Sequence, residues 1–333
     1  MNTFIAIAKG KTRDTFLTQE NLDLLKSFGE IREADGVLTE ESIAASIGDS
    51  EVYMTCWGSP LLSKKILDAA PNLRLLAHLG GTVAPFISSE MWQRGIKVIS
   101  GNEMLAESTA EGALSYILAA QRDIPGFSTN LKEKRQWKKS DAQNFSLIGK
   151  TVGIVSYGSV AKNLVRMLQP FRVRILVYDI VTLPEEEKQK FGMEQVSLET
   201  LFSDSDIISL HTPLTPSTYH LIGKDLFEKI KPGALFINTS RGEVIDQTAL
   251  ERVLADGKIR AMLDVYEKEP LPPDSRLYSL PNLMLMPHMA GPTIDFRAHI
   301  AAVLIHEGHG YIDLGMPLTH EIREEKARNM SAH

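Results

Sequence analysis

Short apolar runs alternate with candidate helices along almost the whole of this 333-residue chain. Apolar runs that are bounded by turn residues are typical of buried strands. In the first third of the chain the predicted strands are Phe4–Ala8, Val52–Thr55, Leu73–Leu79 and Lys97–Ser100. A candidate helix, Ser63–Ala70, lies between two of them. This alternation predicts a parallel sheet with helices on its faces.

A second alternation begins at Lys150 and predicts a complete doubly wound unit. Its expected strands are Thr151–Val155, Arg174–Tyr178, Ile207–Leu210, Ala234–Asn238, Arg260–Val265 and Leu283–Met286. A long apolar helix is expected before it, from Glu103 to about Arg122, with Asn102 as its N-cap. The segment Ile294–Tyr311 predicts a helix that returns the chain to the first domain. We therefore expect an α/β protein of two domains, residues 1–102 plus 299–333 and residues 103–298.

Composition restricts the classes of function. The formal net charge of −6 provides no basic footprint for nucleic acid, and no apolar run approaches the ~18 residues of a membrane span. The run Lys132–Lys139 is expected to be solvated surface, with nucleic-acid binding as the weaker alternative. A single cysteine, Cys56, excludes an internal disulfide and favours the cytoplasm. Between a nucleophile and a small core residue, we favour the core residue for Cys56.

The segment Thr151–Ala161 predicts a strand, a tight turn and the start of a helix, as in the dinucleotide fingerprint G-x-G-x-x-G/A. Here the pattern is Ser156-x-Gly158-x-x-Ala161. Gly158 lies where the backbone must approach a pyrophosphate, and Ala161 permits close packing of helix on strand. Because Ser156 replaces the first glycine, the motif is degenerate, and an ordinary βα turn is the alternative.

An acidic residue at the end of the next strand strengthens this prediction. Asp179 lies 23 residues after Ser156, near the expected place of the carboxylate that binds the ribose 2′-hydroxyl. Ile180 and Val181 follow it, so no adjacent arginine is available for a 2′-phosphate. The sequence therefore favours NAD over NADP, with a simple turn residue as the alternative for Asp179.

Three charged or titratable residues each follow an apolar run: Arg241, Glu269 and His288. In an open parallel sheet, ligands bind at the carboxyl ends of the strands, so these side chains are expected at one edge. A cation, a carboxylate and an imidazole together can hold a carboxylate substrate and move a proton. The alternatives are a salt bridge for Arg241, a loop carboxylate for Glu269 and a satisfied strand-end residue for His288.

Four segments in this order resemble the family of NAD-dependent, D-isomer specific 2-hydroxyacid dehydrogenases. They are His211–Ile222, Lys231–Asp246, Asp264–Leu271 and Pro287–Gly291. The resemblance covers nearly the whole chain. It implies a Rossmann NAD-binding domain, a flavodoxin-like substrate domain, and hydride transfer between NAD(H) and a 2-oxo or D-2-hydroxy acid.

The resemblance also implies roles for the three charged residues. Arg241 matches the arginine that grips the substrate carboxylate and polarises its carbonyl, and His288 matches the histidine that protonates the carbonyl oxygen. Glu269 matches its acidic partner, which favours the imidazolium and fixes its tautomer. Glu267 is a rival for that place, but the family's position falls five residues after Asp264, at Glu269.

Further contacts are implied by the same match. Those to the cofactor are Ser156, Tyr157, Gly158, Ser159, Val160, Asp179, His211, Thr212, Pro213, Thr218, Thr239, Ser240, Arg241, Asp264, His288 and Thr109. Those to the substrate are Gly80, Gly81, Thr82, Trp57 and Arg241, with core packing as the alternative for Trp57. The family pattern has a glycine in place of Thr82 and an acidic residue in place of Ala84. These departures leave the identity of the acid open.

We expect no metal, nucleic-acid or membrane partner, and the family implies a homodimer. The family gives His220 no catalytic role. The main rival function is a dinucleotide-sensing binding protein that resembles the dehydrogenase-like corepressors, since such proteins can keep all three charged residues. An inactive enzyme with weakened NAD binding is a third possibility, suggested only by Ser156.

Overall fold

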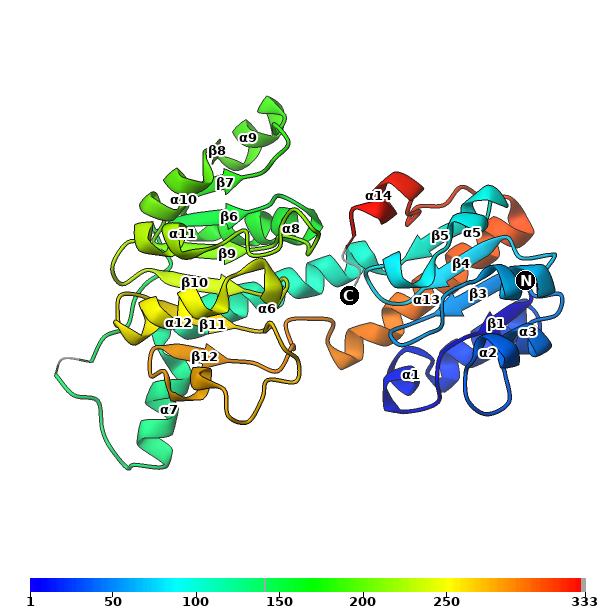
Figure 1. Ribbon diagram of the computed structural model, residues 1–333, viewed down its shortest axis with the longest axis horizontal. Coiled ribbons are helices and arrows are strands. Elements are labelled where there is room, and N and C mark those ends of the chain that lie inside the picture. The colour runs from blue at the N-terminus through cyan, green and yellow to red at the C-terminus, as the bar shows by residue number, and fades with distance from the viewer. Residues whose placement is uncertain (141, 331–333) are drawn as a thin grey trace. The chain divides into compact units, whose positions relative to one another are not determined.

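The computed structural model describes residues 1–140 and 142–330, which form two compact units (Figure 1). Unit 1 comprises Met1–Leu105 and the chain from Pro292 onward, and unit 2 comprises Ala106–Gly291. The expected boundary at residue 298 would divide the helix α13 (Ile294–Leu314). The whole helix instead belongs to unit 1, because it packs on α1 and α2. Residues 331–333, which we assigned to the first domain, lie outside the described residues.

Unit 1 contains a five-stranded, entirely parallel sheet in the order β2-β1-β3-β4-β5. The strands are β1 (Thr3–Ile5), β2 (Ile31–Arg32), β3 (Val52–Thr55), β4 (Leu75–His78) and β5 (Lys97–Ser100). This is the flavodoxin-like order, which has its topological switch point between β1 and β3. The sequence did not predict β2, because two residues at the sheet edge form no apolar run.

Helices cover both faces of this sheet. One face packs against α1 (Lys11–Phe16), α2 (Gln19–Phe28) and α13. The other packs against α3 (Glu40–Ser46), α4 (Lys64–Ala69), α5 (Ser89–Gln93) and α14 (Glu324–Arg328). Cys56 lies buried in the first of these cores, and burial raises the pKa of its thiol to about 11. A protonated, packed thiol agrees with a core residue and not with a nucleophile.

Unit 2 contains a seven-stranded parallel sheet in the order β12-β11-β10-β9-β6-β7-β8. Its strands are β6 (Thr151–Val155), β7 (Arg174–Tyr178), β8 (Met193–Gln195), β9 (Ile207–Leu210), β10 (Leu235–Asn238), β11 (Arg260–Leu263) and β12 (Leu283–Leu285). Strands β8, β7, β6, β9, β10 and β11 follow the Rossmann order, with the switch point between β6 and β9. The predicted fold class is confirmed, but β8 was missed because two of its three residues are polar.

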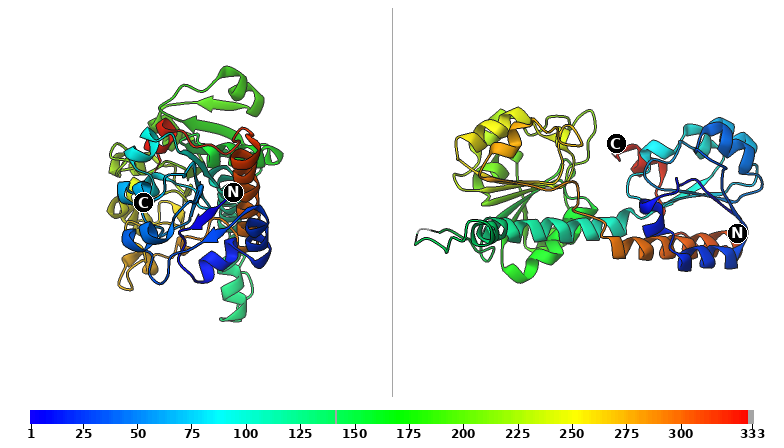
Figure 2. Two further views of the ribbon diagram at one scale, coloured as in Figure 1. Left: turned by 90° about the vertical axis from the view of Figure 1, so that its right-hand side faces the viewer. Right: turned by 90° about the horizontal axis from the view of Figure 1, so that it is seen from below.

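The helices of unit 2 also cover both faces of the sheet (Figure 2). The helices α6 (Asn102–Arg122) and α8 (Ser159–Leu168) pack on one face. The other face packs against α10 (Leu198–Asp204), α11 (Lys224–Lys229) and α12 (Gln247–Ala255). The remaining helices are α7 (Ile124–Lys132) and α9 (Glu185–Phe191), and short 3-10 turns span Ala84–Phe86, Gln169–Phe171, Gly242–Val244 and Arg276–Ser279.

Two local predictions need correction or comment. Asn102 is the first residue of α6 and not its N-cap; its backbone N–H donates to Oγ of Ser100, 3.1 Å away. The basic segment after α7 is exposed in the single chain. Across residues 1–140 and 142–330, no helix is long and apolar enough to cross a membrane. In the same residues, no group of three or more His, Cys, Asp or Glu side chains could hold a metal ion.

Candidate active site

The carboxylate of Asp264 holds the turn that carries His288 at the carboxyl edge of the unit 2 sheet. Asp264 follows β11 and is completely buried. Its carboxylate accepts hydrogen bonds from the backbone N–H of Met289 at 2.7 Å, from that of Ala290 at 2.9 Å and from the hydroxyl of Tyr116 at 3.2 Å. Its carbonyl oxygen accepts from the N–H of His288 at 2.9 Å. The turn after β12 is therefore tied to the end of β11.

His288 and Glu269 form a close pair at this edge. Nδ1 of His288 lies 2.7 Å from Oε2 of Glu269, and Oε1 of Glu269 accepts from the backbone N–H of Tyr266 at 3.0 Å. The hydrogen bond to Glu269 raises the pKa of His288 above its ordinary value. Burial tends to raise the pKa of Glu269, but its hydrogen bonds to His288 and Tyr266 outweigh burial and lower it. The pair therefore favours an imidazolium beside a carboxylate.

Arg241 is placed by a small network at the end of β10. Nδ2 of Asn238 donates to the carbonyl oxygen of Arg241 at 3.0 Å, and Oδ1 of Asn238 accepts from the N–H of Ser240 at 2.9 Å. Nη1 of Arg241 donates to the carbonyl oxygen of Ser240 at 2.7 Å. Burial lowers the pKa of Arg241, while the charge of Glu269 raises it. The guanidinium is thus half-buried and within electrostatic reach of the His288–Glu269 pair.

Glu267, the rival acidic residue, faces a different partner. Its Oε1 lies 3.1 Å from Nε2 of His220 and accepts from the backbone N–H of Gln247 at 3.0 Å. The structure therefore brings Glu269, and not Glu267, to His288.

The turn after β6 fits a dinucleotide. Ser156 has a φ of 71°, a left-handed conformation that glycine adopts more readily, which accounts for the glycine of the usual fingerprint. Its hydroxyl lies 2.8 Å from Oγ1 of Thr212 after β9, so the two sides of the switch point are joined. A Cβ on Gly158 would meet nothing within 4 Å, which leaves open space before the amino terminus of α8. These features match a pyrophosphate site.

Asp179 organises the neighbouring turn. Its carboxylate accepts from the backbone N–H of Tyr157 at 2.7 Å and from that of Val181 at 2.9 Å. Each carboxylate oxygen keeps a lone pair for a further donor, such as a ribose hydroxyl. Ile180 and Val181 are exposed beside it and offer no positive charge to a 2′-phosphate.

Several other predicted cofactor residues lie in the same unit. His211 follows β9, lies 2.9 Å from Oγ of Ser209 through Nε2, and has its pKa lowered to about 4 by burial. Thr109 on α6 packs closely against Gly291, just after the His288 turn. The other predicted cofactor residues lie at the ends of β6, β9 and β10. Ser159 and Val160 begin α8 after β6, and the hydroxyl of Thr218 donates to the carbonyl oxygen of Pro213 at 2.6 Å in the loop after β9. Thr239 and Ser240, after β10, are buried.

The predicted substrate residues other than Arg241 belong to unit 1. Gly80, Gly81 and Thr82 follow β4, and Oγ of Ser100 donates to the carbonyl oxygen of Gly81 at 3.0 Å. Trp57 follows β3 and is 42% exposed, so it is not a core residue. Sequence reasoning missed Asn238 and Tyr116, which hold Arg241 and Asp264; a polar residue ending an apolar run was the only available signal for Asn238.

Replacement of Glu269 by Gln should lower the pKa of His288, because it removes the negative charge that raises this pKa and leaves only a neutral amide oxygen as acceptor. Histidine-ring NMR across a pH titration measures this, and Glu267→Gln is the matched control, since Glu267 faces His220. The raised pKa of His288 stabilises the folded protein. This stabilisation is fully present below the pKa of His288 in the unfolded chain, about 6.5, and is lost as pH rises through its pKa in the folded protein. An unchanged His288 titration in Glu269→Gln would contradict the pairing.

Comparison with known proteins agrees with this geometry. Residues 114–290 match the model of the D-isomer specific 2-hydroxyacid dehydrogenase NAD binding domain. A glyoxylate reductase from Korarchaeum cryptofilum is 34% identical over 270 residues, which are 80% of this chain and 81% of that protein. A D-3-phosphoglycerate dehydrogenase from Archaeoglobus fulgidus is 30% identical over 289 residues, 86% of this chain but only 54% of its relative. The crystal structure of a phosphoglycerate oxidoreductase from Rhizobium etli, 29% identical, superposes with a TM-score of 0.81 over 97% of this chain and 98% of that one. The chain is thus an oxidoreductase with an NAD-binding domain, and it belongs to the D-isomer specific 2-hydroxyacid dehydrogenase family.

Proposed function

We propose that this protein is an NAD-dependent D-2-hydroxyacid dehydrogenase in which Arg241, Glu269 and His288 act on a 2-oxo or D-2-hydroxy acid. The observation that carries the proposal is the 2.7 Å contact of His288 with Glu269 beside a half-buried Arg241. A protonatable imidazole next to a guanidinium provides an acid and a carboxylate receptor at one sheet edge.

NAD supplies the hydride acceptor or donor when it is bound, and the chain's own residues do the rest. Arg241 binds the substrate carboxylate through its planar fork and polarises the adjacent carbonyl. His288, whose Nδ1 faces Glu269, uses Nε2 to protonate the carbonyl oxygen in reduction and to accept the hydroxyl proton in oxidation. Glu269 stabilises the imidazolium that exists before proton donation and after proton acceptance.

The proposed cofactor contacts follow from the turns described above. The backbone at Ser156–Val160 and the amino terminus of α8 hold the pyrophosphate, and Asp179 binds the ribose hydroxyls. The predicted cofactor residues at the ends of β9 and β10, together with Asp264 and Thr109, line the part of the site that would hold the nicotinamide. In unit 1, the backbone N–H groups of Gly80–Thr82 and the side chain of Trp57 contact the substrate.

A dinucleotide-sensing binding protein would show the same three charged residues. The relatives described above are named as enzymes, which supports catalysis. Turnover separates the two functions, because a sensor binds NADH without oxidising it.

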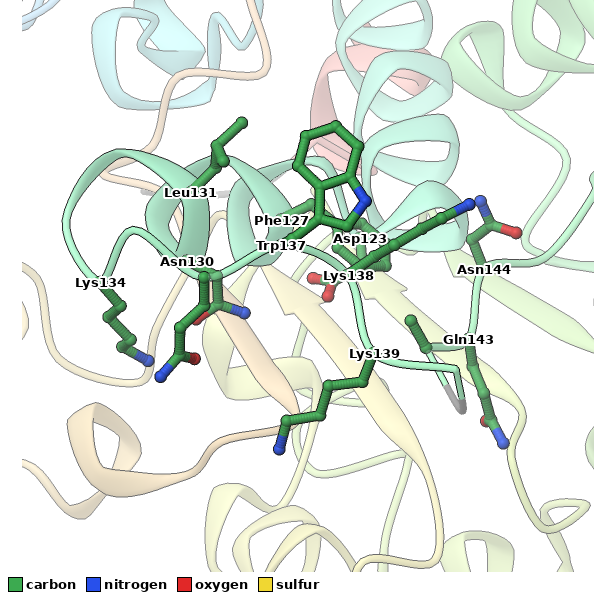
Figure 3. A pocket seen from close by; sticks show the side chains of 12 residues that line it. Asp123, Phe127, Asn130, Leu131, Lys134, Trp137, Lys138, Lys139, Gln143 and Asn144 are labelled. Carbon is green, nitrogen blue, oxygen red and sulfur yellow. The ribbon is translucent and has the colours of Figure 1, made fainter.

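A homodimer formed through unit 2 is part of the proposal. The helix α7 and the segment that follows it line a pocket of about 620 Å³, and Figure 3 shows the side chains that line it. Large apolar side chains are exposed along the same stretch: Ile124, Leu131, Trp137, Phe145 and Ile148. We propose that these side chains form one apolar patch, and such a patch is typical of a surface that a protein partner covers. The second copy of this chain is the partner that the family implies.

Replacement of His288 by Ala should lower kcat for NADH-dependent reduction by ~10²-fold or more, because the proton donor is lost, while NADH still binds. Absorbance at 340 nm with a panel of 2-oxo acids measures turnover, and NADH fluorescence measures binding. His299→Ala, an exposed histidine of unit 1, is the control. Near-normal turnover of the His288 variant would remove this residue from the mechanism.

Replacement of Leu131 by Asp should convert the dimer to a monomer, because a charge would have to be buried in an apolar interface. Size-exclusion chromatography with light scattering measures the mass, which should approach 37.0 kDa. Val37→Asp is the matched control, since Val37 is 80% exposed in unit 1. A wild-type protein that already runs as a monomer would refute the dimer.

A further inference from the structure

One side-chain amide in unit 2 bridges the loop that follows β7. Gln195 is the last residue of the edge strand β8, and the register places it opposite Val177 of β7, two residues before Asp179. Its Nε2 donates to the carbonyl oxygen of Val181 at 2.9 Å and to that of Asp179 at 3.3 Å. Its Oε1 accepts from the backbone N–H of Leu183 at 2.9 Å. One side chain therefore makes hydrogen bonds to three backbone groups of this loop.

The three hydrogen bonds fix which end of the amide faces which partner. Two of the partners are carbonyl oxygens, which can only accept, so they require the NH2 end of Gln195. The third partner is an N–H group, which requires the amide oxygen. A carboxylate of the same length would lack the donor, and an apolar side chain would lack both donor and acceptor. An amide is thus the side chain that this position requires.

Side-chain packing does not hold the middle of this loop. Ile180 is 91% exposed and Val181 is 64% exposed, so neither is fixed by burial in a core. Leu183 is buried on the face of the sheet that carries α6 and α8, and it anchors the far end of the loop. Between β7 and Leu183 the position of the backbone therefore depends on hydrogen bonds, and Gln195 provides three of them.

The same loop fixes the carboxylate of Asp179. Oδ1 of Asp179 accepts from the backbone N–H of Val181 at 2.9 Å, and Oδ2 accepts from that of Tyr157 at 2.7 Å. Gln195 holds Val181 by its carbonyl oxygen, while the N–H of the same residue holds the carboxylate. A displacement of Val181 would therefore displace the group to which the ribose hydroxyls are proposed to bind.

We propose that Gln195 is a positioning residue for recognition of the adenosine ribose of NAD(H). It holds the loop after β7 in place before the cofactor binds, so that Asp179 meets the ribose hydroxyls without a loop having to be ordered first. A loop that is ordered only on binding lowers affinity, and one that is held in advance does not. This inference rests on the proposed function, in which Asp179 binds those hydroxyls. It concerns affinity for the cofactor and leaves proton transfer at His288 unaffected.

The test measures the Kd for NADH by fluorescence titration in Gln195→Met, which keeps the length of the side chain but removes the amide. The Kd should rise about tenfold, because the loop must then be ordered on binding. At saturating NADH, kcat for reduction of a 2-oxo acid should stay within about twofold of the wild type. Gln169→Met is the matched control, since Nε2 of Gln169 donates to the carbonyl oxygens of Val165 and Phe191 at 3.1 and 3.3 Å. This control loses an amide at the other end of α8 and should bind NADH as the wild type does.

A double-mutant cycle shows whether Gln195 acts through Asp179. Asp179→Ala removes the acceptor for the ribose and should itself raise the Kd for NADH. In that background Gln195→Met should add less than about twofold, although it adds about tenfold to the wild type, because the group that it positions is already gone. A merely structural role of Gln195 would give the same increase in both backgrounds.

Each contrary result has a distinct meaning. An unchanged Kd in Gln195→Met, or equal increases in both backgrounds of the cycle, would overturn the role of Gln195. A wild type that binds no NADH would overturn the proposed cofactor site and this inference with it. A wild type that binds NADH but reduces no 2-oxo acid would overturn the proposed function alone, because the Kd values still decide the role of Gln195. If Gln195→Met does not fold, Gln195→Glu replaces it, since it keeps the acceptor for Leu183 and loses the donor, and its Kd should rise at least as much.

Discussion

The geometry of the candidate active site depends on satisfying one buried carboxylate. Asp264 has no exposed surface, so its oxygens must find donors inside the protein. They find them in Tyr116 on α6 and in two successive N–H groups of the turn after β12. These bonds hold His288 in a left-handed backbone conformation, with a φ of 55°, which a non-glycine residue adopts only when its surroundings impose it. The position of the His288 imidazole therefore follows from the hydrogen bonds that the buried carboxylate of Asp264 requires.

Opposing charges then tune the imidazole. Glu269 raises the pKa of His288 through a hydrogen bond and its charge, whereas Arg241 lowers it. The same arginine lowers the pKa of Glu269, which keeps that carboxyl ionised. Because the guanidinium is half-buried, its charge is screened less than it would be in water. A site that must hold an anion and still keep a proton ready needs this balance, and a chain with only two of the three groups would lack it.

Much of the fold could be predicted from the sequence, because its central strands are buried. The central strands β6, β7 and β9 are buried on both faces, so each is a continuous apolar run with clear ends, and their predicted bounds agree with the structure. The short edge strands β2 and β8 contain polar residues and show no such run. The resemblance chose Glu269 over Glu267 by its spacing from Asp264, but only the fold of the loop after β11 shows why: it turns Glu269 to His288 and Glu267 to His220.

The most direct test of His288 as the proton donor is the pH dependence of kcat/KM for NADH-dependent reduction of the best 2-oxo acid. Reduction needs His288 in its protonated form in the free enzyme, and Glu269 raises its pKa above the ordinary value of about 6.5. We expect a plateau in kcat/KM near pH 6, followed by a fall of about tenfold per pH unit above a pKa higher than 6.5. A profile that stays level from pH 6 to pH 10, or that rises with pH, would contradict the role of His288 as the proton donor.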